Sequence, residues 1–332
     1  MINPRLFEHY GIDTAKNLHI KKRCPRPFDT VLIDKQGSCY ACECQSWLPQ
    51  SIGNLQIKSL SEIVGSDTAR ELQNSIKDGT YRYCNNRQCS YILAPKGNTL
   101  WQDHNPENKI QHIRLAIDDS CNLSCPSCRT TQIFDNNKNS LAKKILLAEK
   151  ILDYVKNQKH QINLHIGSDG DPFASLVYRH FIRKAKDLAN VRFTLQTNGL
   201  LIKKMYHRHR LMFEKLDVLN ISIDGATKGT YEKLRRGGKF IKMLENLNFV
   251  KRLDRSFKLH LHMVVQQDNW HEMPAMLRIA RKINADCLYL NKIQNWNTAL
   301  DFKQQTFTSN SKFKILLNQM KQDDLTIVAT LF

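Results

Sequence analysis

The stretch Cys121-Asn-Leu-Ser-Cys125-Pro-Ser-Cys128 carries three thiols at CxxxCxxC spacing. Thiols this close in the chain can bind one metal centre without strain, and three ligands leave one coordination position open. A structural zinc ion normally takes four protein ligands. The motif therefore favours an iron–sulfur cluster in which one iron has no protein ligand, a position where chemistry can occur.

Six further cysteines precede this motif: Cys24, Cys39, Cys42, Cys44, Cys84 and Cys89. In a chain without an export signal, such tight spacings indicate metal ligation rather than disulfides. Six thiols are more than one four-ligand site needs and fewer than two such sites take, so we expect one site with spare thiols. Residues 30–34 and 39–44 read as a hairpin around a turn at Gly37, and capped helices are expected near 59–64 and 67–77.

The charge balance indicates an anionic partner. The chain has 332 residues, of which 50 are Lys or Arg and 31 are Asp or Glu, so its formal charge is +19. Such a charge attracts nucleic acid, acidic peptides, phosphorylated or nucleotide-linked substrates, or an acidic electron carrier such as flavodoxin or ferredoxin. Lysines spread over solvated helix faces are the alternative explanation. The sequence shows neither a transmembrane segment nor a signal peptide, which predicts a soluble, cytoplasmic protein without a membrane partner.

Strand-like and helix-like patterns alternate through the middle of the chain. The strand-like runs are 113–118, 162–166, 191–195, 218–223, 258–265 and 287–290, and amphipathic helices such as 140–156 and 240–253 lie between them. Six β/α repeats predict an α/β fold with a parallel sheet, open or curled into a partial barrel.

The predicted strands alternate between apolar and polar residues, whereas parallel strands covered on both faces are usually apolar throughout. The alternation therefore predicts a polar interior face opposite the helices. His165, His260 and His262 lie on that face and are expected to be hydrogen-bonded there, with substrate acids or bases, or a metal pair, as the alternatives. Cys287 falls on the same face, where it is either a small buried residue or a hydrogen-atom donor.

The CxxxCxxC stretch resembles the signature loop of the radical S-adenosylmethionine (SAM) superfamily. This resemblance implies a 4Fe–4S cluster held by Cys121, Cys125 and Cys128 as catalytic and metal-binding residues, with SAM on the open iron. It also implies that an electron from the cluster cleaves SAM to a 5′-deoxyadenosyl radical. The fold it implies is a partial (β/α)6 barrel of the radical SAM type.

Loops that follow the predicted strands resemble the family's SAM-binding segments, and in α/β folds ligands bind at those strand ends. Gly-Asp-Pro stands here where the family has Gly-Glu-Pro, and Arg235 resembles an arginine that faces the SAM carboxylate. Turn capping at Asn198 and an ordinary surface position for Arg235 are the alternatives. The cofactor-binding residues implied by the resemblance are Gly170, Asp171, Pro172, Asn198, Ser222, Asp224, Arg235 and Gln266.

The N-terminal cysteines resemble the auxiliary-cluster module called SPASM, or its shorter twitch form. Cys24, Gly37 and Cys42 match the first half of the pattern, although the module usually follows the radical SAM core. The resemblance implies one auxiliary 4Fe–4S cluster whose expected ligands are Cys24, Cys42, Cys84 and Cys89, with Cys39 or Cys44 as substitutes. A four-cysteine zinc ribbon is the alternative.

These inferences predict a small cysteine-rich α+β domain at residues 1–95, a linker at 96–110, the partial barrel at 111–295 and a helical extension at 296–332. The predicted function is a radical SAM enzyme that abstracts hydrogen from a substrate, with a peptide or protein preferred over a carbohydrate or small molecule. Its auxiliary cluster would transfer electrons or anchor the substrate. A reducing partner such as flavodoxin or ferredoxin would supply electrons to the enzyme. A basic nucleic-acid-binding protein with structural metal sites, or an RNA-modifying radical SAM enzyme, are the alternatives.

Overall fold

The computed structural model describes residues 2–20, 23–93, 109–293, 305–306, 311–320 and 323–330. The chain divides into two compact units. The first unit comprises residues 1–118, 138–169 and 187–192, and the second comprises residues 119–137, 170–186 and 193–332. None of the helices described is long and apolar enough to cross a membrane.

The first unit contains a mixed sheet with the strand order β5-β4-β1-β2-β3. Its strands are β1 (Thr30–Asp34), β2 (Ser38–Tyr40), β3 (Ser51–Asn54), β4 (His112–Ala116) and β5 (Ile162–Ile166). Strand β1 pairs with β2 in antiparallel fashion, as the predicted hairpin requires, and with β4 in parallel, so that Ile33 lies opposite Leu115. The cysteine-rich hairpin therefore extends the parallel sheet.

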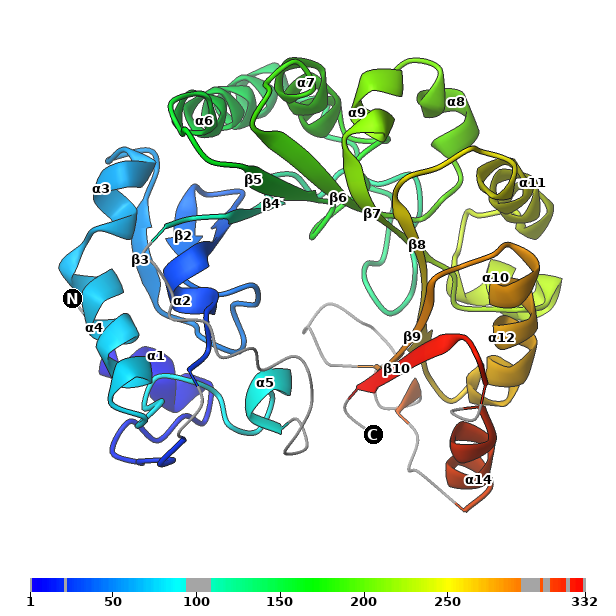
Figure 1. Ribbon diagram of the computed structural model, residues 1–332, viewed down its shortest axis with the longest axis horizontal. Coiled ribbons are helices and arrows are strands. Elements are labelled where there is room, and N and C mark those ends of the chain that lie inside the picture. Colours follow the sequence, from blue (N-terminus) through cyan, green and yellow to red (C-terminus); the bar gives the residue numbers. More distant parts are fainter. Residues whose placement is uncertain are drawn as a thin grey trace. The chain divides into compact units, whose positions relative to one another are not determined.

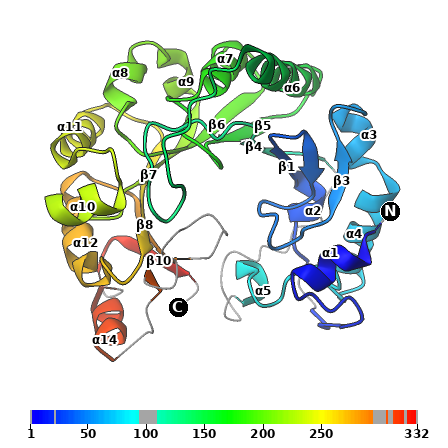
Figure 2. The same cartoon turned by 180° about the vertical axis from the view of Figure 1, so that it is seen from behind.

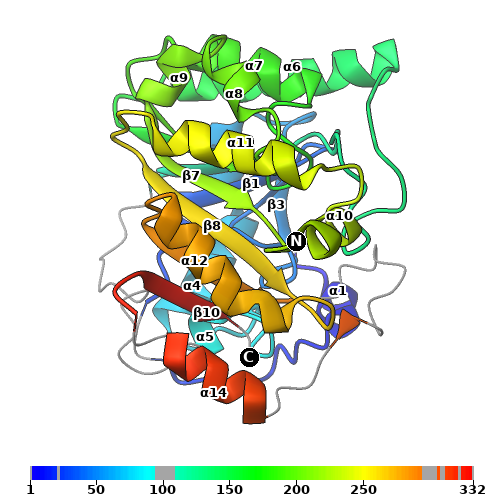
Figure 3. The same cartoon turned by 90° about the vertical axis from the view of Figure 1, so that its right-hand side faces the viewer.

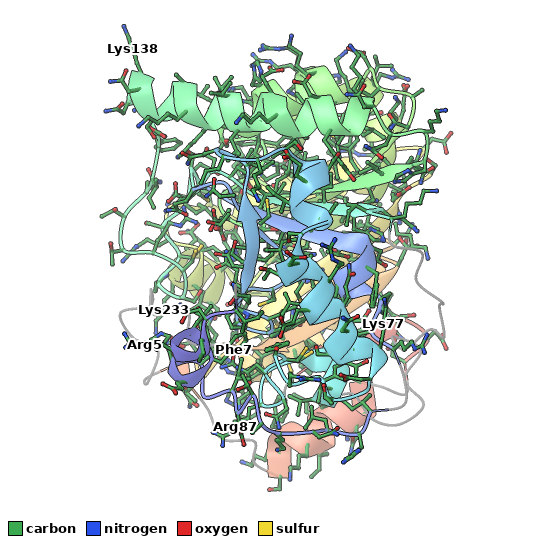
Figure 4. All side chains as sticks on the ribbon, turned by 90° about the vertical axis from the view of Figure 1, so that its left-hand side faces the viewer. Arg5, Phe7, Lys77, Arg87, Lys138 and Lys233 are labelled. Atoms are coloured by element: carbon green, nitrogen blue, oxygen red, sulfur yellow. The ribbon has the colours of Figure 1, made fainter. Side chains whose placement is uncertain are left out.

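In the described part of this unit, the helices are α1 (Pro4–His9), α2 (Arg26–Asp29), α3 (Leu60–Val64), α4 (Asp67–Lys77), α5 (Ser90–Leu93) and α6 (Lys138–Lys156). Helix α3 begins with the predicted capping box, in which the Ser59 and Glu62 side chains satisfy each other's backbone N–H groups. Such a cap stabilises a helix by about 1 kcal/mol. The basic side chains Arg5, Lys77 and Arg87 lie on the surface of this unit, whereas Phe7 is buried (Figure 4).

The second unit is built on parallel strands in the order β10-β9-β8-β7-β6. These are β6 (Val191–Thr197, within this unit from Phe193 onward), β7 (Leu216–Ser222), β8 (Lys258–Val265), β9 (Cys287–Lys292) and β10 (Thr326–Thr330). The helices are α7 (Leu176–Ala185), α8 (Ile202–Tyr206), α9 (Arg210–Glu214), α10 (Lys228–Leu234), α11 (Phe240–Lys251), η1 (Trp270–Glu272), α12 (Met273–Lys282) and α14 (Ser311–Met320). Within the unit, helices α8, α11 and α12 lie on one side of the strands (Figures 1 and 2).

The two faces of β5, β6 and β8 differ as the sequence alternation predicted. In β8, Leu259, Leu261 and Met263 are fully buried, while His260 and His262 are only partly buried. Figure 3 shows α11 and α12 passing in front of β7 and β8. A slip of one residue would move every apolar side chain to the polar face. Full burial of each is worth about 1.5–3 kcal/mol, which holds the strands in this register.

Three features of the fold differ from or exceed the sequence-based expectation. The returning strand of the hairpin is limited to residues 38–40, so Cys42 and Cys44 lie in the loop that follows it. Strands β3 and β10 were not predicted from the sequence. Most of the predicted linker, residues 96–108, lies outside the described residues. The predicted domain boundaries therefore stay a prediction.

Candidate functional site

The CxxxCxxC loop lies in the second unit and is fastened at several points. An isolated bridge pairs Cys121 with the segment after the motif, and the Cys128 N–H donates to the Cys125 carbonyl at 2.9 Å. Between them, the Ser124 N–H donates to the Arg236 carbonyl at 3.0 Å, and Arg236 Nε donates to Ser124 Oγ at 3.1 Å. The protein chain thus shapes this loop by itself, and the positions of its thiols are pre-organised.

Burial controls the chemistry of two of these thiols. Cys121 and Cys125 are buried, while Cys128 is exposed. Burial raises the pKa of Cys121 to about 11 and also raises the pKa of Cys125, although the nearby Arg235 opposes the latter effect. Thiolates are the form that binds metal. Iron binding at Cys121 and Cys125 therefore has to release protons, which makes assembly of the site dependent on pH.

The buried carboxylate of Asp171 organises the loop at 170–172. Its Oδ2 accepts from Thr197 Oγ1 at 2.8 Å and from the Asn198 N–H at 2.9 Å, and its Oδ1 accepts from the N–H groups of residues 173 and 174. Burial raises the pKa of this carboxyl group, and the four hydrogen bonds oppose the rise. The side chain of Asp171 is thus occupied inside the protein, and the backbone of its loop is what remains to bind a ligand.

Asn198 connects the end of β6 to the cysteine loop. Its Nδ2 donates to Asn122 Oδ1 at 2.8 Å and lies 3.7 Å from Cys121 Sγ, while its Oδ1 accepts from the Leu200 N–H at 3.1 Å. The hydrogen bond from the Leu200 N–H is the turn capping that was the alternative interpretation of Asn198. The structure shows both roles together, so Asn198 belongs to the surroundings of the cysteine loop as well as to the turn.

Asp224 and Arg235 form a buried ion pair beside the cysteine loop. Arg235 Nε lies 2.8 Å from Asp224 Oδ2, and Arg235 Nη1 donates to Cys125 Sγ at 3.9 Å. Burial disfavours the charged guanidinium, but Asp224, Cys125 and Tyr231 together outweigh it, and the pKa of Arg235 is raised. Arg235 is therefore a permanent buried cation and not an ordinary surface arginine. Ser222, at the end of β7, accepts a hydrogen bond from Gln196.

Two buried polar atoms in this region are left for a ligand. Gln266 Nε2 and Tyr231 Oη have no hydrogen-bond partner within the described part of the chain. Gln266 is tied by its backbone to Asn269, whose amide donates to the Asp224 carbonyl at 2.9 Å. An unsatisfied buried polar group costs about 1–3 kcal/mol, which an incoming polar ligand would recover. These atoms, with the Arg235 cation, fit a ligand that carries carboxylate, amine and hydroxyl groups, as SAM does.

In the first unit, the thiols of Cys24, Cys42, Cys84 and Cys89 come together. Burial, with a contribution from the neighbouring Cys89, raises the pKa of Cys24 to about 12. Burial likewise raises the pKa of Cys42 and of Cys84, and Cys24 and Cys89 both add to the rise in each case. These four are the ligands that the sequence favoured. Whether they bind metal stays a prediction.

The two substitute ligands differ in position. Cys44 is close enough to Cys89 to affect its pKa, whereas the pKa of Cys39 is raised to about 12 by burial and by Asp34, with no cysteine involved. Within the described ranges, no three His, Cys, Asp or Glu side chains converge as ligands of a single metal ion. Thiolates of an iron–sulfur cluster bind different iron atoms, so they need not converge on one point.

Glu43, between Cys42 and Cys44, is shared by two guanidinium groups. Arg26 Nε and Arg114 Nη1 each lie 3.5 Å from one of its carboxylate oxygens. Asp29 also lies close enough to Arg26 to raise its pKa, so the two cations face two anions. Arg26 opposes the rise in the pKa of Cys24, and Arg114 opposes the rise in the pKa of Cys44. These cations therefore favour the thiolate form that would bind an iron–sulfur cluster.

The polar face of the second unit carries a group of neutral rings. His262 Nε2 lies 2.8 Å from Asn220 Oδ1, and the His262 ring stacks on Tyr289 with 4.4 Å between centroids. His260 Nδ1 is 3.3 Å from the same Asn220 oxygen. The expectation of hydrogen-bonded histidines is confirmed. Since Asn220 Oδ1 can only accept, each histidine donates to it.

The free energy of unfolding should decrease as the pH is lowered, because His262 resists protonation in the folded state. Burial, then His260 and Arg235, lower the pKa of His262 to about 3, while an unfolded chain protonates near pH 6.5. The unfolded state therefore binds more protons below pH 6.5, so stability is lost as pH falls. We expect His262 to cost about 1 kcal/mol of unfolding free energy between pH 6.5 and 5.5. Urea unfolding of His262→Gln should lack this loss, whereas the exposed His271→Gln should keep it. An unchanged pH profile in His262→Gln would contradict the assignment.

Gly225, directly after Asp224, is required by a close backbone approach. A Cβ atom at Gly225 would lie 2.4 Å from the backbone nitrogen of Tyr231, whereas one at Gly229 would meet nothing within 4 Å. We expect Gly225→Ala to destabilise the protein by about 3 kcal/mol or more, because backbone has to move. Gly229→Ala, inside α10, should be neutral or stabilising by up to about 1 kcal/mol. Chemical unfolding of both variants measures the difference, and equal stabilities would refute the steric argument.

Several residues of the site were not found from the sequence. Arg129 places Nε and Nη2 each 3.4 Å from Cys128 Sγ. Asn269 holds Gln266 and Asp224 together, and Arg236 fastens the cysteine loop. Arg129 directly follows Cys128 in the chain, which was a usable signal. Asn269 and Arg236 gave none that distinguishes them from ordinary polar residues.

Family comparisons agree with both cysteine sites. Residues 117–280 match the model of the radical SAM superfamily, and residues 24–90 match the SPASM model, described as an iron–sulfur cluster-binding domain. The first match contains the CxxxCxxC loop and strands β5 to β8, and the second contains all six N-terminal cysteines. The two matches together define a SAM-dependent iron–sulfur protein with an α/β fold.

The chain belongs to the radical SAM superfamily and carries its SPASM domain on the N-terminal side of the radical SAM domain. The 4Fe–4S cluster with SAM, and an auxiliary iron–sulfur cluster, are the cofactors of these two domains. The resemblance predicted from CxxxCxxC and from the N-terminal cysteine spacing is thereby confirmed, including the unusual domain order.

Curated relatives match only part of the chain. A GTP 3′,8-cyclase of Alkaliphilus oremlandii is 28% identical over 152 residues, which cover 44% of this chain and 44% of that protein. A GTP 3′,8-cyclase of Alkaliphilus metalliredigens is 31% identical over 153 residues, which cover 44% of this chain and 45% of that protein. The chain thus spans less than half the length of these two relatives.

Among solved structures, Streptococcus suis SuiB bound to S-adenosylmethionine matches with a TM-score of 0.48 and 12% identity, covering 67% of this chain and 50% of that chain. The anSMEcpe structure with bound AdoMet and Cp18Cys peptide matches with a TM-score of 0.45 and 17% identity, covering 65% of this chain and 62% of that chain.

Proposed function

We propose that this protein reductively cleaves SAM and uses the resulting 5′-deoxyadenosyl radical to abstract hydrogen from an anionic substrate. The observation that carries the proposal is the second unit's cysteine loop, with Arg235 and the unpartnered Gln266 Nε2 beside it. When bound, the cluster and SAM supply the one-electron chemistry that no side chain can provide. The protein supplies position and charge.

Each proposed SAM-binding residue has a distinct task. Arg235 is a fixed cation suited to a carboxylate, and Asp224 keeps it charged and oriented. Gln266 offers an amide donor, and Gly170 and Pro172 flank Asp171, whose carboxylate is satisfied internally and fixes the course of this loop. Ser222 and Asn198 lie at the ends of their strands and complete the set. This division of tasks supports binding of a zwitterionic ligand such as SAM.

For the substrate, two candidates follow from different observations. The auxiliary cluster, which we assign to Cys24, Cys42, Cys84 and Cys89, favours a peptide or protein, which was the preference from sequence. The curated relatives named GTP 3′,8-cyclase favour a nucleoside triphosphate, and the charge of +19 suits either when the peptide is acidic. In both cases an acidic electron carrier such as flavodoxin or ferredoxin is the proposed reductant.

The test uses anaerobically reconstituted protein with dithionite and SAM. Formation of 5′-deoxyadenosine supports the reaction class, and its absence in protein that holds two clusters contradicts it. The same assay with GTP, and separately with acidic peptides, shows which substrate accelerates cleavage and incorporates label from a deuterated position into 5′-deoxyadenosine. A protein that binds RNA in a salt-dependent manner but forms no 5′-deoxyadenosine would instead be the basic binding protein.

A further inference from the structure

Every thiol of the CxxxCxxC loop has its own nitrogen donor. Asn198 Nδ2 lies 3.7 Å from Cys121 Sγ, and Arg235 Nη1 lies 3.9 Å from Cys125 Sγ. Arg129 is closest, with Nε and Nη2 each 3.4 Å from Cys128 Sγ. The three donors come from different parts of the second unit, so their arrangement is a property of the fold and not of the loop alone.

These donors are held in place by other contacts. Asn198 is fastened to Asn122 at 2.8 Å, and Arg235 to Asp224 at 2.8 Å. The third nitrogen of the Arg129 guanidinium, Nη1, donates to the Asp119 carbonyl. Each guanidinium nitrogen of Arg129 thus donates a hydrogen bond, and two of the three donate to the same sulfur. Such a fixed geometry costs little reorganisation when the charge on the sulfur changes.

Arg235 and Arg129 differ in whether a carboxylate balances their positive charge. Asp224, which is almost completely buried, compensates Arg235. Within the described residues, no carboxylate forms an ion pair with Arg129. Its guanidinium donates to the Asp119 carbonyl and the Cys128 sulfur, while its backbone N–H donates to the Cys125 carbonyl and its own carbonyl accepts from Arg236. Arg129 therefore brings an uncompensated positive charge to the sulfur. An electron added to an iron–sulfur cluster increases negative charge on its sulfurs, and hydrogen bonds and nearby cations stabilise that reduced form.

We propose that Arg129 is a positioning residue that raises the reduction potential of the radical SAM cluster through two N–H···S hydrogen bonds to Cys128. Asn198 and Arg235 are the corresponding donors for Cys121 and Cys125. Their effects are smaller, because their distances to sulfur are longer and the charge of Arg235 is balanced by Asp224. The proposal rests on the assignment of the three cysteines as cluster ligands and makes no use of the substrate.

The test is a redox titration of the reconstituted cluster, followed by electron paramagnetic resonance of the reduced state. Arg129→Met should lower the equilibrium constant for reduction about tenfold, which is about 59 mV for one electron. Arg129→Lys keeps the charge without the two-nitrogen fork and should shift the potential by less. Arg236→Met is the matched control, since Arg236 fastens the same loop through Ser124 and Thr130 without a bond to a thiol.

The possible outcomes distinguish failure of the Arg129 proposal from failure of the assignment of the cluster ligands. An unchanged potential in Arg129→Met, at the same iron content as wild type, overturns the proposal, as does an equal shift in Arg236→Met. If Arg129→Met does not assemble its cluster, Arg129→Gln decides, because it keeps an amide donor and should give an intermediate potential. If the Cys128→Ala variant kept the signal of the reduced radical SAM cluster, the assignment of Cys128 as a cluster ligand would be wrong.

Discussion

Replacement of Cys125 by alanine is expected to abolish SAM cleavage and to leave the auxiliary cluster in place. Cys125 is the central, buried thiol of the loop and receives the Arg235 donor. Loss of a residue that only supports a metal ligand costs about 10–100-fold in activity or metal affinity, so loss of the ligand itself should cost more than about a hundredfold. The auxiliary cysteines belong to the first unit, in which no ligand changes.

Two measurements on anaerobically reconstituted protein check this result. Iron per chain should fall from about eight to about four, as expected when one of two 4Fe–4S clusters is lost. Formation of 5′-deoxyadenosine should fall to the background of the assay. Cys287→Ala is the control for removing a buried thiol, and it should keep its iron. Undiminished cleavage in Cys125→Ala, or loss of both clusters together, would refute the two-site assignment.

Much of the fold could be predicted because strands such as β5, β6 and β8 alternate with a period of two. The apolar positions of β8 were assigned to the helix-covered face from sequence alone, and Leu259, Leu261 and Met263 are indeed buried. The same reasoning missed β3, where Ser51 to Asn54 contain a single large apolar residue, Ile52. Such a short edge strand exists because β2 offers it hydrogen bonds, which no periodicity in its own residues records.

The candidate site was predictable where chemistry is concentrated in the chain and not where it depends on contacts between distant residues. CxxxCxxC is contiguous, so its role could be inferred directly. Arg114 and Glu43 are far apart in sequence, and only pairing of β1 with β4 brings their elements together. Asp171 was found through its motif, but two of its partners, Thr197 and Asn198, lie in a different part of the chain, at the end of strand β6.

This difference leads to the second large effect, which is a loss of stability in Asp171→Ala. Four donors would lose their acceptor at once: Thr197 Oγ1 and the N–H groups of residues 173, 174 and 198. Each buried donor left unsatisfied costs about 1–3 kcal/mol, but the effects are not additive, and the variant is also relieved of burying a carboxylate. A net loss of about 3 kcal/mol is expected. That is a large part of a typical total of about 5–15 kcal/mol.

A graded series distinguishes this mechanism from general damage to the loop. Asp171→Asn keeps one oxygen acceptor and should lose less stability than Asp171→Ala, while Thr197→Val removes a single donor and should cost only about 1–2 kcal/mol. Urea unfolding of the three variants measures the order. The iron content should follow the same order, because Asn198, displaced with its N–H partner, also donates to Cys121. If Asp171→Ala were within about 1 kcal/mol of wild type, the carboxylate could not be the organising centre of this loop, and its hydrogen bonds would be replaceable by water.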